Sequence, residues 1–239
     1  MKNLINKPLI QRKYALTAGI ALMVMAIAAV FSYGIVLGRL VIDGDAIATL
    51  DNIQSSIILF KAGIMGWFII LISDIVVSLS LYKFLKTFNK RLALLGAGLR
   101  LIYAGILGIS ILNLLFVMIL TNNLEYFPTI TIYQIQSLVM LFLNAFHIVW
   151  SIGLIFFGGH LMVIGYVTLT SSILPKTISI LLLLASISYI IIHSNYTFFP
   201  NINEITIILE SILSIPMFLG ELSFAIWLLF KGGKIAKRL

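Results

Sequence analysis

The sequence predicts an all-α fold, a polytopic integral membrane helix bundle with six transmembrane helices and a short interfacial helix. Hydrophobic residues make up 61% of the 239 positions and charged residues 10%, whereas charged residues make up roughly a quarter of a soluble domain. The apolar residues form six runs, each close to or longer than the roughly 20 residues that a helix needs to cross a bilayer. A polar stretch after the first run has the N-cap residue and the helical spacing that predict the short interfacial helix.

The first span is expected at residues 14–38. A cleaved signal peptide is the alternative, because basic residues precede the apolar run, but this run is longer than the apolar part of a signal sequence. The polar stretch from Arg39 to Ser56 follows. Within it Asp45 is a natural N-cap, and Leu50 and Ile53 belong to apolar positions at helical spacing. This pattern predicts the short interfacial helix ahead of the second span.

The remaining spans are expected at residues 60–85, 92–120, 137–169, 178–196 and 205–230. The fourth is unusually long and contains Gly158-Gly159. It is therefore either one long tilted helix or a helix that bends at the glycine pair. The six spans leave no room for a separate soluble domain, so we interpret residues 1–239 as a single transmembrane domain.

Basic residues are distributed unequally between the two predicted sides of the membrane. Six spans place both termini on one side, and that side holds thirteen of the sixteen Lys and Arg residues. These are Lys2, Lys7, Arg12, Lys13, Lys83, Lys86, Lys90, Arg91, Lys176, Lys231, Lys234, Lys237 and Arg238. The asymmetry predicts cytoplasmic termini. Because the net charge of +8 is explained by topology, the expected partner is the lipid bilayer and not a nucleic acid.

Short motifs that extend over nearly the whole chain resemble those of a known family. They are Arg12-Lys13-Tyr14-Ala15, Gly44-Asp45-Ala46, Leu81-Tyr82, Leu99-Arg100, Phe156-Phe157-Gly158 and Gly220-Glu221-Leu222. In these residues the chain resembles the bacterial multi-pass membrane family catalogued as domain of unknown function 4386. The resemblance implies a protein of the bacterial cytoplasmic membrane, and it brings no established activity, substrate or cofactor.

An acid and a base stand inside two neighbouring spans. Asp74 and Arg100 flank the basic turn at residues 83–91, and at about 1.5 Å per residue both lie roughly 20 Å from its centre. Charged groups inside a bilayer are costly and usually paired, so we expect these two to face each other. Glu221 of the last span lies in the same half of the membrane, and His160 joins this depth if the fourth span is unbroken. Two acids for one base leave a surplus acid.

The fourth span adds Asn144 and His147 on one helical face. We expect His147 to be an auxiliary hydrogen-bond donor of the same site, while a histidine that only bonds to a neighbouring helix is the alternative. No metal site is predicted, because the three histidines do not share a depth and the chain has no cysteine. No cofactor and no catalytic residue are assigned either.

Three classes of function fit this pattern. In the first, the protein handles a small anionic or zwitterionic solute, or protons, through an intramembrane polar site that comprises Asp74, Arg100, Glu221, His147 and Asn144. In the second, it is a non-catalytic accessory or sensor subunit whose buried charges are structural, either as a homo-oligomer or with a partner membrane protein. The third is an intramembrane lipid-modifying enzyme. We favour it least, because no paired-histidine metal motif and no G-x-S-x-G elbow is present.

Overall fold

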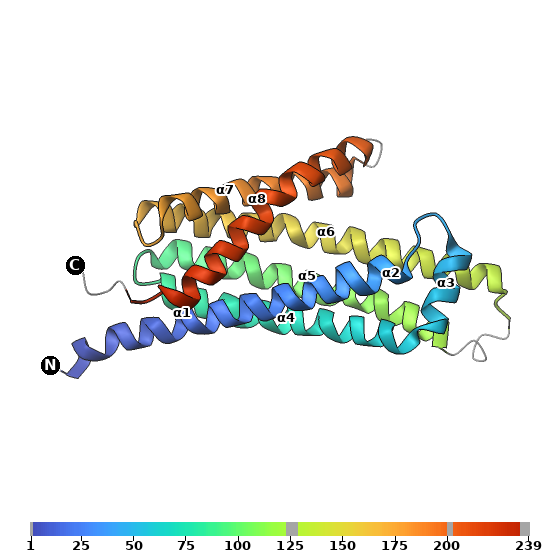
Figure 1. Ribbon diagram of the computed structural model, residues 1–239, viewed down its shortest axis with the longest axis horizontal. Coiled ribbons are helices and arrows are strands. Elements are labelled where there is room, and N and C mark those ends of the chain that lie inside the picture. The colour runs from blue at the N-terminus through green and yellow to red at the C-terminus, as the bar shows by residue number, and fades with distance from the viewer. Residues whose placement is uncertain (1, 123–128, 200–202, 235–239) are drawn as a thin grey trace. The chain divides into compact units, whose positions relative to one another are not determined.

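The computed structural model describes residues 2–122, 129–199 and 203–234 (Figure 1). Its elements are α1 (Lys2–Ala29), a π-helical segment (Val30–Leu37), α2 (Gly38–Leu40), α3 (Ala46–Ser55), α4 (Ile57–Leu85), α5 (Lys90–Asn122), α6 (Ile132–Thr170), α7 (Lys176–Phe198) and α8 (Asn203–Phe230). These residues contain no strand, and six helical segments in them are long and apolar enough to cross a membrane. The all-α prediction with six candidate spans is confirmed.

The helices extend beyond several of the predicted span ends. Helix α1 begins at Lys2 rather than at residue 14, and α6 begins at Ile132 rather than at residue 137. Helices are held by backbone hydrogen bonds, which continue into polar flanking residues. The apolar runs therefore located each helix better than they located its ends.

Helix α6 runs without interruption through Gly158-Gly159, which settles the alternative that the sequence left open. A Cβ atom on Gly158 would lie 3.0 Å from the Ser186 carbonyl oxygen of α7, and one on Gly165 would lie 3.2 Å from the Leu183 nitrogen. Small residues let helix backbones approach closely within a membrane. The helix is thus continuous at the glycine pair, and the glycine at position 158 serves the packing of α6 against α7.

The predicted short helix is present as α3. Asp45 has extended backbone angles, and its side chain accepts a hydrogen bond from the Ala48 nitrogen at 2.9 Å. Gly44 precedes it with a φ of +78°, a conformation that favours glycine. The Ile42 nitrogen also donates to the Thr49 hydroxyl at 2.9 Å. The N-cap predicted at Asp45 is confirmed.

The described residues form two compact units. Unit 1 draws on residues 1–23, 73–104 and 151–239, and unit 2 on residues 24–72 and 105–150. Helices α1, α4, α5 and α6 contribute to both units, α7 and α8 belong to unit 1 alone, and α3 belongs to unit 2. The interpretation of the chain as a single transmembrane domain stays a prediction.

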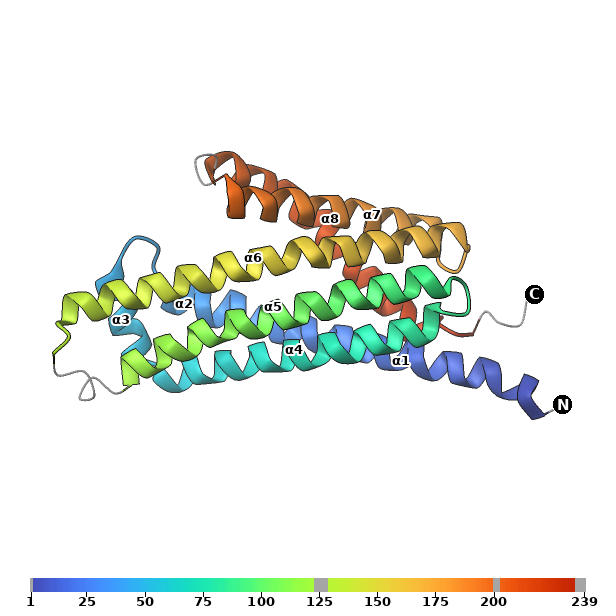
Figure 2. The ribbon, with the colours of Figure 1, turned by 180° about the vertical axis from the view of Figure 1, so that it is seen from behind.

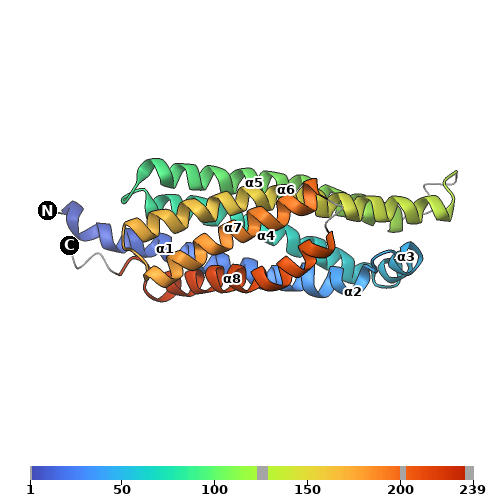
Figure 3. The same ribbon diagram turned by 90° about the horizontal axis from the view of Figure 1, so that it is seen from above.

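Two contacts between neighbouring helices are clear in unit 1. Helices α7 and α8 lie side by side (Figures 1 and 3), and a Cβ atom on Gly220 would lie 3.0 Å from the Leu181 carbonyl oxygen. Helices α4 and α5, which a short turn joins (Figure 2), are linked by a hydrogen bond from Ser78 Oγ to the Ala97 carbonyl at 2.9 Å.

The guanidinium group of Arg12, on α1, lies at the carboxyl end of α8. It donates to the carbonyl oxygens of Leu228 and Gly232, at 3.0 and 2.8 Å, and to that of Leu229. The last carbonyls of a helix have no partner inside the helix. Arg12 therefore caps α8 and joins the first helix to the last within unit 1.

Candidate functional site

Asp74 of α4 and Arg100 of α5 form an ion pair inside unit 1. Arg100 Nη2 lies 2.7 Å from Asp74 Oδ1, and the two side chains are 1% and 0% exposed. At this distance the guanidinium group also donates a hydrogen bond to the carboxylate. The pairing expected from the depth of the two residues is present.

His160 of α6 joins this pair. Arg100 Nη1 lies 3.1 Å from His160 Nε2, and His160 Nδ1 lies 2.8 Å from the Gly96 carbonyl oxygen. An arginine can only donate and a carbonyl can only accept, so Nε2 is the acceptor and Nδ1 carries the hydrogen. His160 is therefore neutral in this arrangement. It sets the direction of Arg100 without adding a charge.

The ring of Phe157 lies against the guanidinium group of Arg100. The Arg100 guanidinium carbon lies 5.1 Å from the centre of the Phe157 ring, within the range of a cation–π interaction. The rings of Tyr103 and Tyr189 each lie 5.1 Å from the same ring. Helices α5, α6 and α7 thus all supply groups to the surroundings of Arg100.

Glu221 of α8 is held by a tyrosine. The hydroxyl of Tyr189, on α7, donates to Glu221 Oε1 at 2.7 Å. Arg100 and Asp74 both lie within electrostatic reach of this carboxyl group. The two predicted acids therefore have different contacts, since Asp74 forms an ion pair with the base and Glu221 accepts a hydrogen bond from Tyr189. We refer to Asp74, Arg100, His160, Tyr189 and Glu221 as the polar layer.

Asn144 and His147 belong to unit 2, so the predicted set of five site residues is divided between the two units. They contribute to a cavity of about 390 Å³. Its lining residues are Val41, Asp43, Ser137, Met140, Leu141, Leu143, Asn144 and His147. The His147 ring also lies 6.1 Å from the ring of Tyr33.

A family model described as "Domain of unknown function (DUF4386)" matches residues 17–232. The chain belongs to this family. The match includes the whole polar layer and the residues that line the cavity of unit 2. The DUF4386 resemblance seen in the short motifs is therefore confirmed.

This DUF4386 chain is 29% identical over 192 residues to a protein of Archaeoglobus fulgidus named "Uncharacterized protein". The aligned part covers 80% of this chain and 94% of the relative. No solved structure matches the chain. The comparisons thus support a multi-pass membrane protein of the DUF4386 family.

Two members of the polar layer were not among the predicted site residues. His160 had a signal, because an unbroken fourth span places it at the depth of Arg100. Tyr189 had none, since a tyrosine within an apolar span is common and the side that it faces depends on how α7 is rotated. In the part of the DUF4386 chain that the structure describes, no group of three or more His, Cys, Asp or Glu residues could hold a metal ion.

Proposed function

We propose that this DUF4386 protein resides in the cell membrane with cytoplasmic termini, and that it binds a small anionic or zwitterionic solute at Arg100 while Glu221 exchanges a proton. The observation that carries the proposal is a fully buried arginine that is offset by one paired acid, with a second acid held nearby by a tyrosine. Ionisable groups inside membrane spans usually mark pathways for ions, solutes or protons.

The charges of the polar layer give a reason why solute binding at Arg100 should be coupled to proton exchange at Glu221. With His160 neutral, the layer has one positive group and two groups that can be negative. An anion that approaches Arg100 competes with Asp74 and adds a charge that is poorly solvated there. Proton uptake by Asp74 or Glu221 offsets this charge. Binding of an anion is then linked to binding of a proton.

Cysteine labelling in purified protein tests the proposal, because the chain has no cysteine of its own. The variant Glu221→Cys places one thiol in the polar layer. A water-soluble, negatively charged methanethiosulfonate reagent should label it several times faster than a positively charged one, because Arg100 attracts the anion. The protein is reconstituted in lipid for this labelling, and the matched control is Leu219→Cys, two positions away on an exposed face of α8, which the surrounding lipid should shield from both reagents.

The contrary outcomes are also clear. If neither reagent reaches the thiol of Glu221→Cys, the layer is dry and solute binding is wrong. If the positively charged reagent reacts faster, the layer does not select anions.

A second candidate is an accessory subunit in which the same groups only join helices. It is favoured by the way Asp74, Arg100 and His160 connect α4, α5 and α6 through direct contacts. Among the described residues, a Cβ atom on Gly34 would meet nothing within 4 Å and one on Gly38 only a carbonyl of its own helix. That face is open to another helix, from a second copy or from a partner protein. A dry polar layer together with a stable complex on purification would favour this candidate.

A further inference from the structure

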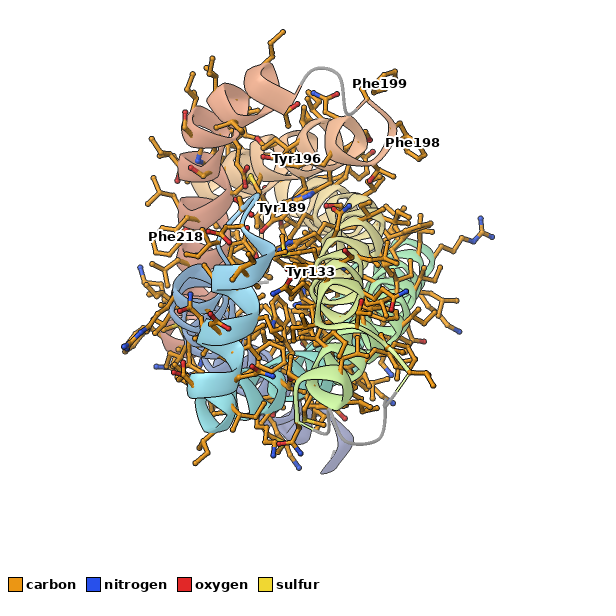
Figure 4. All side chains as sticks on the ribbon, turned by 90° about the vertical axis from the view of Figure 1, so that its right-hand side faces the viewer. Tyr133, Tyr189, Tyr196, Phe198, Phe199 and Phe218 are labelled. Atoms are coloured by element: carbon orange, nitrogen blue, oxygen red, sulfur yellow. The ribbon has the colours of Figure 1, made fainter. Side chains whose placement is uncertain are left out.

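Helices α7 and α8 share two hydrogen bonds of the same kind. The Tyr189 hydroxyl donates to Glu221 at 2.7 Å, and the Tyr196 hydroxyl donates to Glu210 Oε2 at 2.6 Å. Figure 4 shows Tyr189 and Tyr196 on the inner side of these helices, whereas Phe198 and Phe218 lie at the periphery. The second pair stands near the loop between the helices, and the first stands in the polar layer.

His193 lies between the two tyrosines. Its ring is stacked on Tyr189 with centres 5.7 Å apart, and it lies 6.3 Å from the ring of Tyr196. The side chain is 8% exposed, and Nδ1 lies 3.3 Å from the Ser151 hydroxyl of α6. Positions 189, 193 and 196 share one face of α7, because they are spaced by four and three residues.

Ser186 extends this face by one more step, three residues before Tyr189. It is fully buried, and its hydroxyl has no hydrogen-bond partner among the described residues. Buried polar groups nearly always have a partner, and ordered water commonly supplies it where the protein does not. The face of α7 that carries the tyrosines and His193 therefore continues to a buried hydroxyl that can still donate and accept a hydrogen bond.

We propose that Glu210, Tyr196, His193 and Tyr189 form a proton pathway from the loop end of α7 and α8 to Glu221. A carboxyl group and a histidine ring accept a proton on one atom and release one from another, whereas a tyrosine hydroxyl accepts one proton and releases its own from the same oxygen. When Glu210 takes up a proton, its hydrogen bond with Tyr196 reverses, so that Glu210 donates and the Tyr196 hydroxyl passes its own proton toward His193. His193 is stacked on Tyr189 and tilted against Tyr196, and neither contact is a hydrogen bond. The proposed transfer therefore requires one water molecule between His193 and each tyrosine. One proton enters at Glu210 and one arrives at Glu221, with no change of oxidation state.

The groups that face this pathway are compatible with it. Around Glu221 the charged and titratable neighbours are Tyr189 on α7, Arg100 on α5 and Asp74 on α4. Around His193 they are Tyr189 and Tyr196, with the neutral hydroxyl of Ser151 on α6. No described lysine or arginine contacts the histidine, so a positive charge that passes through it meets no direct repulsion.

A packing role alone explains the arrangement less well. Helices α7 and α8 already approach closely at Gly220, whose Cβ position would be 3.0 Å from a carbonyl of α7. Hydrogen bonds from the two tyrosines are not needed to bring the helices together. The His193 ring packs between the two tyrosines, and its long hydrogen bond of 3.3 Å to Ser151 involves only one of the two ring nitrogens through which a histidine exchanges protons.

The proton pathway rests on the proposed proton exchange at Glu221. One experiment tests the pathway and the proton exchange separately. After a rapid pH change, infrared spectroscopy of the protein in lipid nanodiscs follows the carboxyl band that Glu221→Gln abolishes. In His193→Gln and in Tyr196→Phe, this band should change at least tenfold more slowly and reach the same end point. The control is His147→Gln, a histidine of unit 2, which should keep the rate of the unaltered protein. Tyr196→Phe removes only a hydroxyl, so it remains informative if His193→Gln does not fold.

The outcomes are distinguishable. A Glu221 band that never changes with pH overturns proton exchange and the pathway together. A band that changes at the unaltered rate in His193→Gln or in Tyr196→Phe overturns the pathway and leaves the proposed function standing. An equal slowing in His147→Gln also overturns the pathway, because the effect would then not depend on the face of α7.

Discussion

Units 1 and 2 bury different kinds of side chain, although α1, α4, α5 and α6 contribute to both. The ionisable Asp, Arg and His side chains that are buried in the described chain all lie in unit 1. They are Asp74, Arg100, His160 and His193. The buried polar residues described in unit 2 carry only hydroxyl groups. They are Ser32, Thr49, Ser110 and Thr121.

The core of unit 2 is organised by aromatic rings. Trp67 is 1% exposed, and the rings of Phe146 and Trp150 each lie 4.9 Å from its ring at steep angles, an arrangement that aromatic pairs prefer. In unit 1 the central ring, Phe157, instead lies beneath a guanidinium group. The comparison teaches that charge is buried in the unit to which α7 and α8 belong, since α7 supplies Tyr189 and α8 supplies Glu221.

The largest expected effect comes from breaking the ion pair of unit 1. Asp74→Asn or Arg100→Gln leaves one buried charge without its partner, and each should lower the free energy of unfolding by about 3–5 kcal/mol. The double variant should lose clearly less than the two single losses combined, because no lone charge remains. Thermal melting of the purified variants measures this cycle.

If the double variant lost as much unfolding free energy as the two single variants together, Asp74 and Arg100 would not stabilise each other. The difference in buried charge between units 1 and 2 would then have no energetic consequence. The control is Asp43→Asn, an exposed acid of unit 2. It should change the free energy of unfolding by no more than about 0.5 kcal/mol.

A smaller effect is expected where α8 packs on α7. Gly220→Ala places a Cβ atom 3.0 Å from the Leu181 carbonyl oxygen, a backbone atom that cannot swing aside, so it should cost about 1–3 kcal/mol in melting experiments. At Gly105 of α5, in unit 2, a Cβ atom would meet nothing within 4 Å. Gly105→Ala should therefore be neutral or stabilise by up to about 1 kcal/mol. Equal behaviour of the two variants would show that unit 1 does not depend on the close approach of α7 and α8.

Counting residues along the chain predicted how far along its span each residue lies, but not which way its side chain points. The six spans, the N-cap at Asp45 and the pairing of Asp74 with Arg100 all follow from distances along helices. Which way a side chain points depends on how its helix is rotated, and spans that are apolar on every side carry little periodicity to reveal this. Tyr189 was missed for that reason.

Asn144 and His147 were assigned to the polar site from a shared face of α6. His147 and His160 are thirteen positions apart, which is roughly 20 Å along a helix. The structure places Asn144 and His147 in unit 2, and His160, on the same helix, in unit 1. Whether Asn144 and His147 take part in solute binding stays a prediction.

The aromatic core of unit 2 can be examined by removing one polar atom. Trp67 Nε1 is buried and has no hydrogen-bond partner among the described residues. Trp67→Phe deletes this donor and keeps an aromatic ring, so it should cost at most about 1.5 kcal/mol, whereas Trp67→Ala should cost about 3–5 kcal/mol. Melting temperatures of both variants compare the two losses. If Trp67→Phe were as harmful as Trp67→Ala, a hydrogen bond and not ring packing would hold this core.

The smallest expected effect concerns an acid of unit 2 that acts only as a hydrogen-bond acceptor. Asp45→Ala removes the bond to the Ala48 nitrogen and should destabilise α3 by about 1 kcal/mol, seen as faster hydrogen exchange of its amides. Asp45→Asn keeps an acceptor oxygen and should leave exchange nearly unchanged. At Asp74 the same change from Asp to Asn should be harmful, because there the charge itself is needed opposite Arg100. Similar effects of the two Asp→Asn changes would mean that the units do not differ in their use of charge.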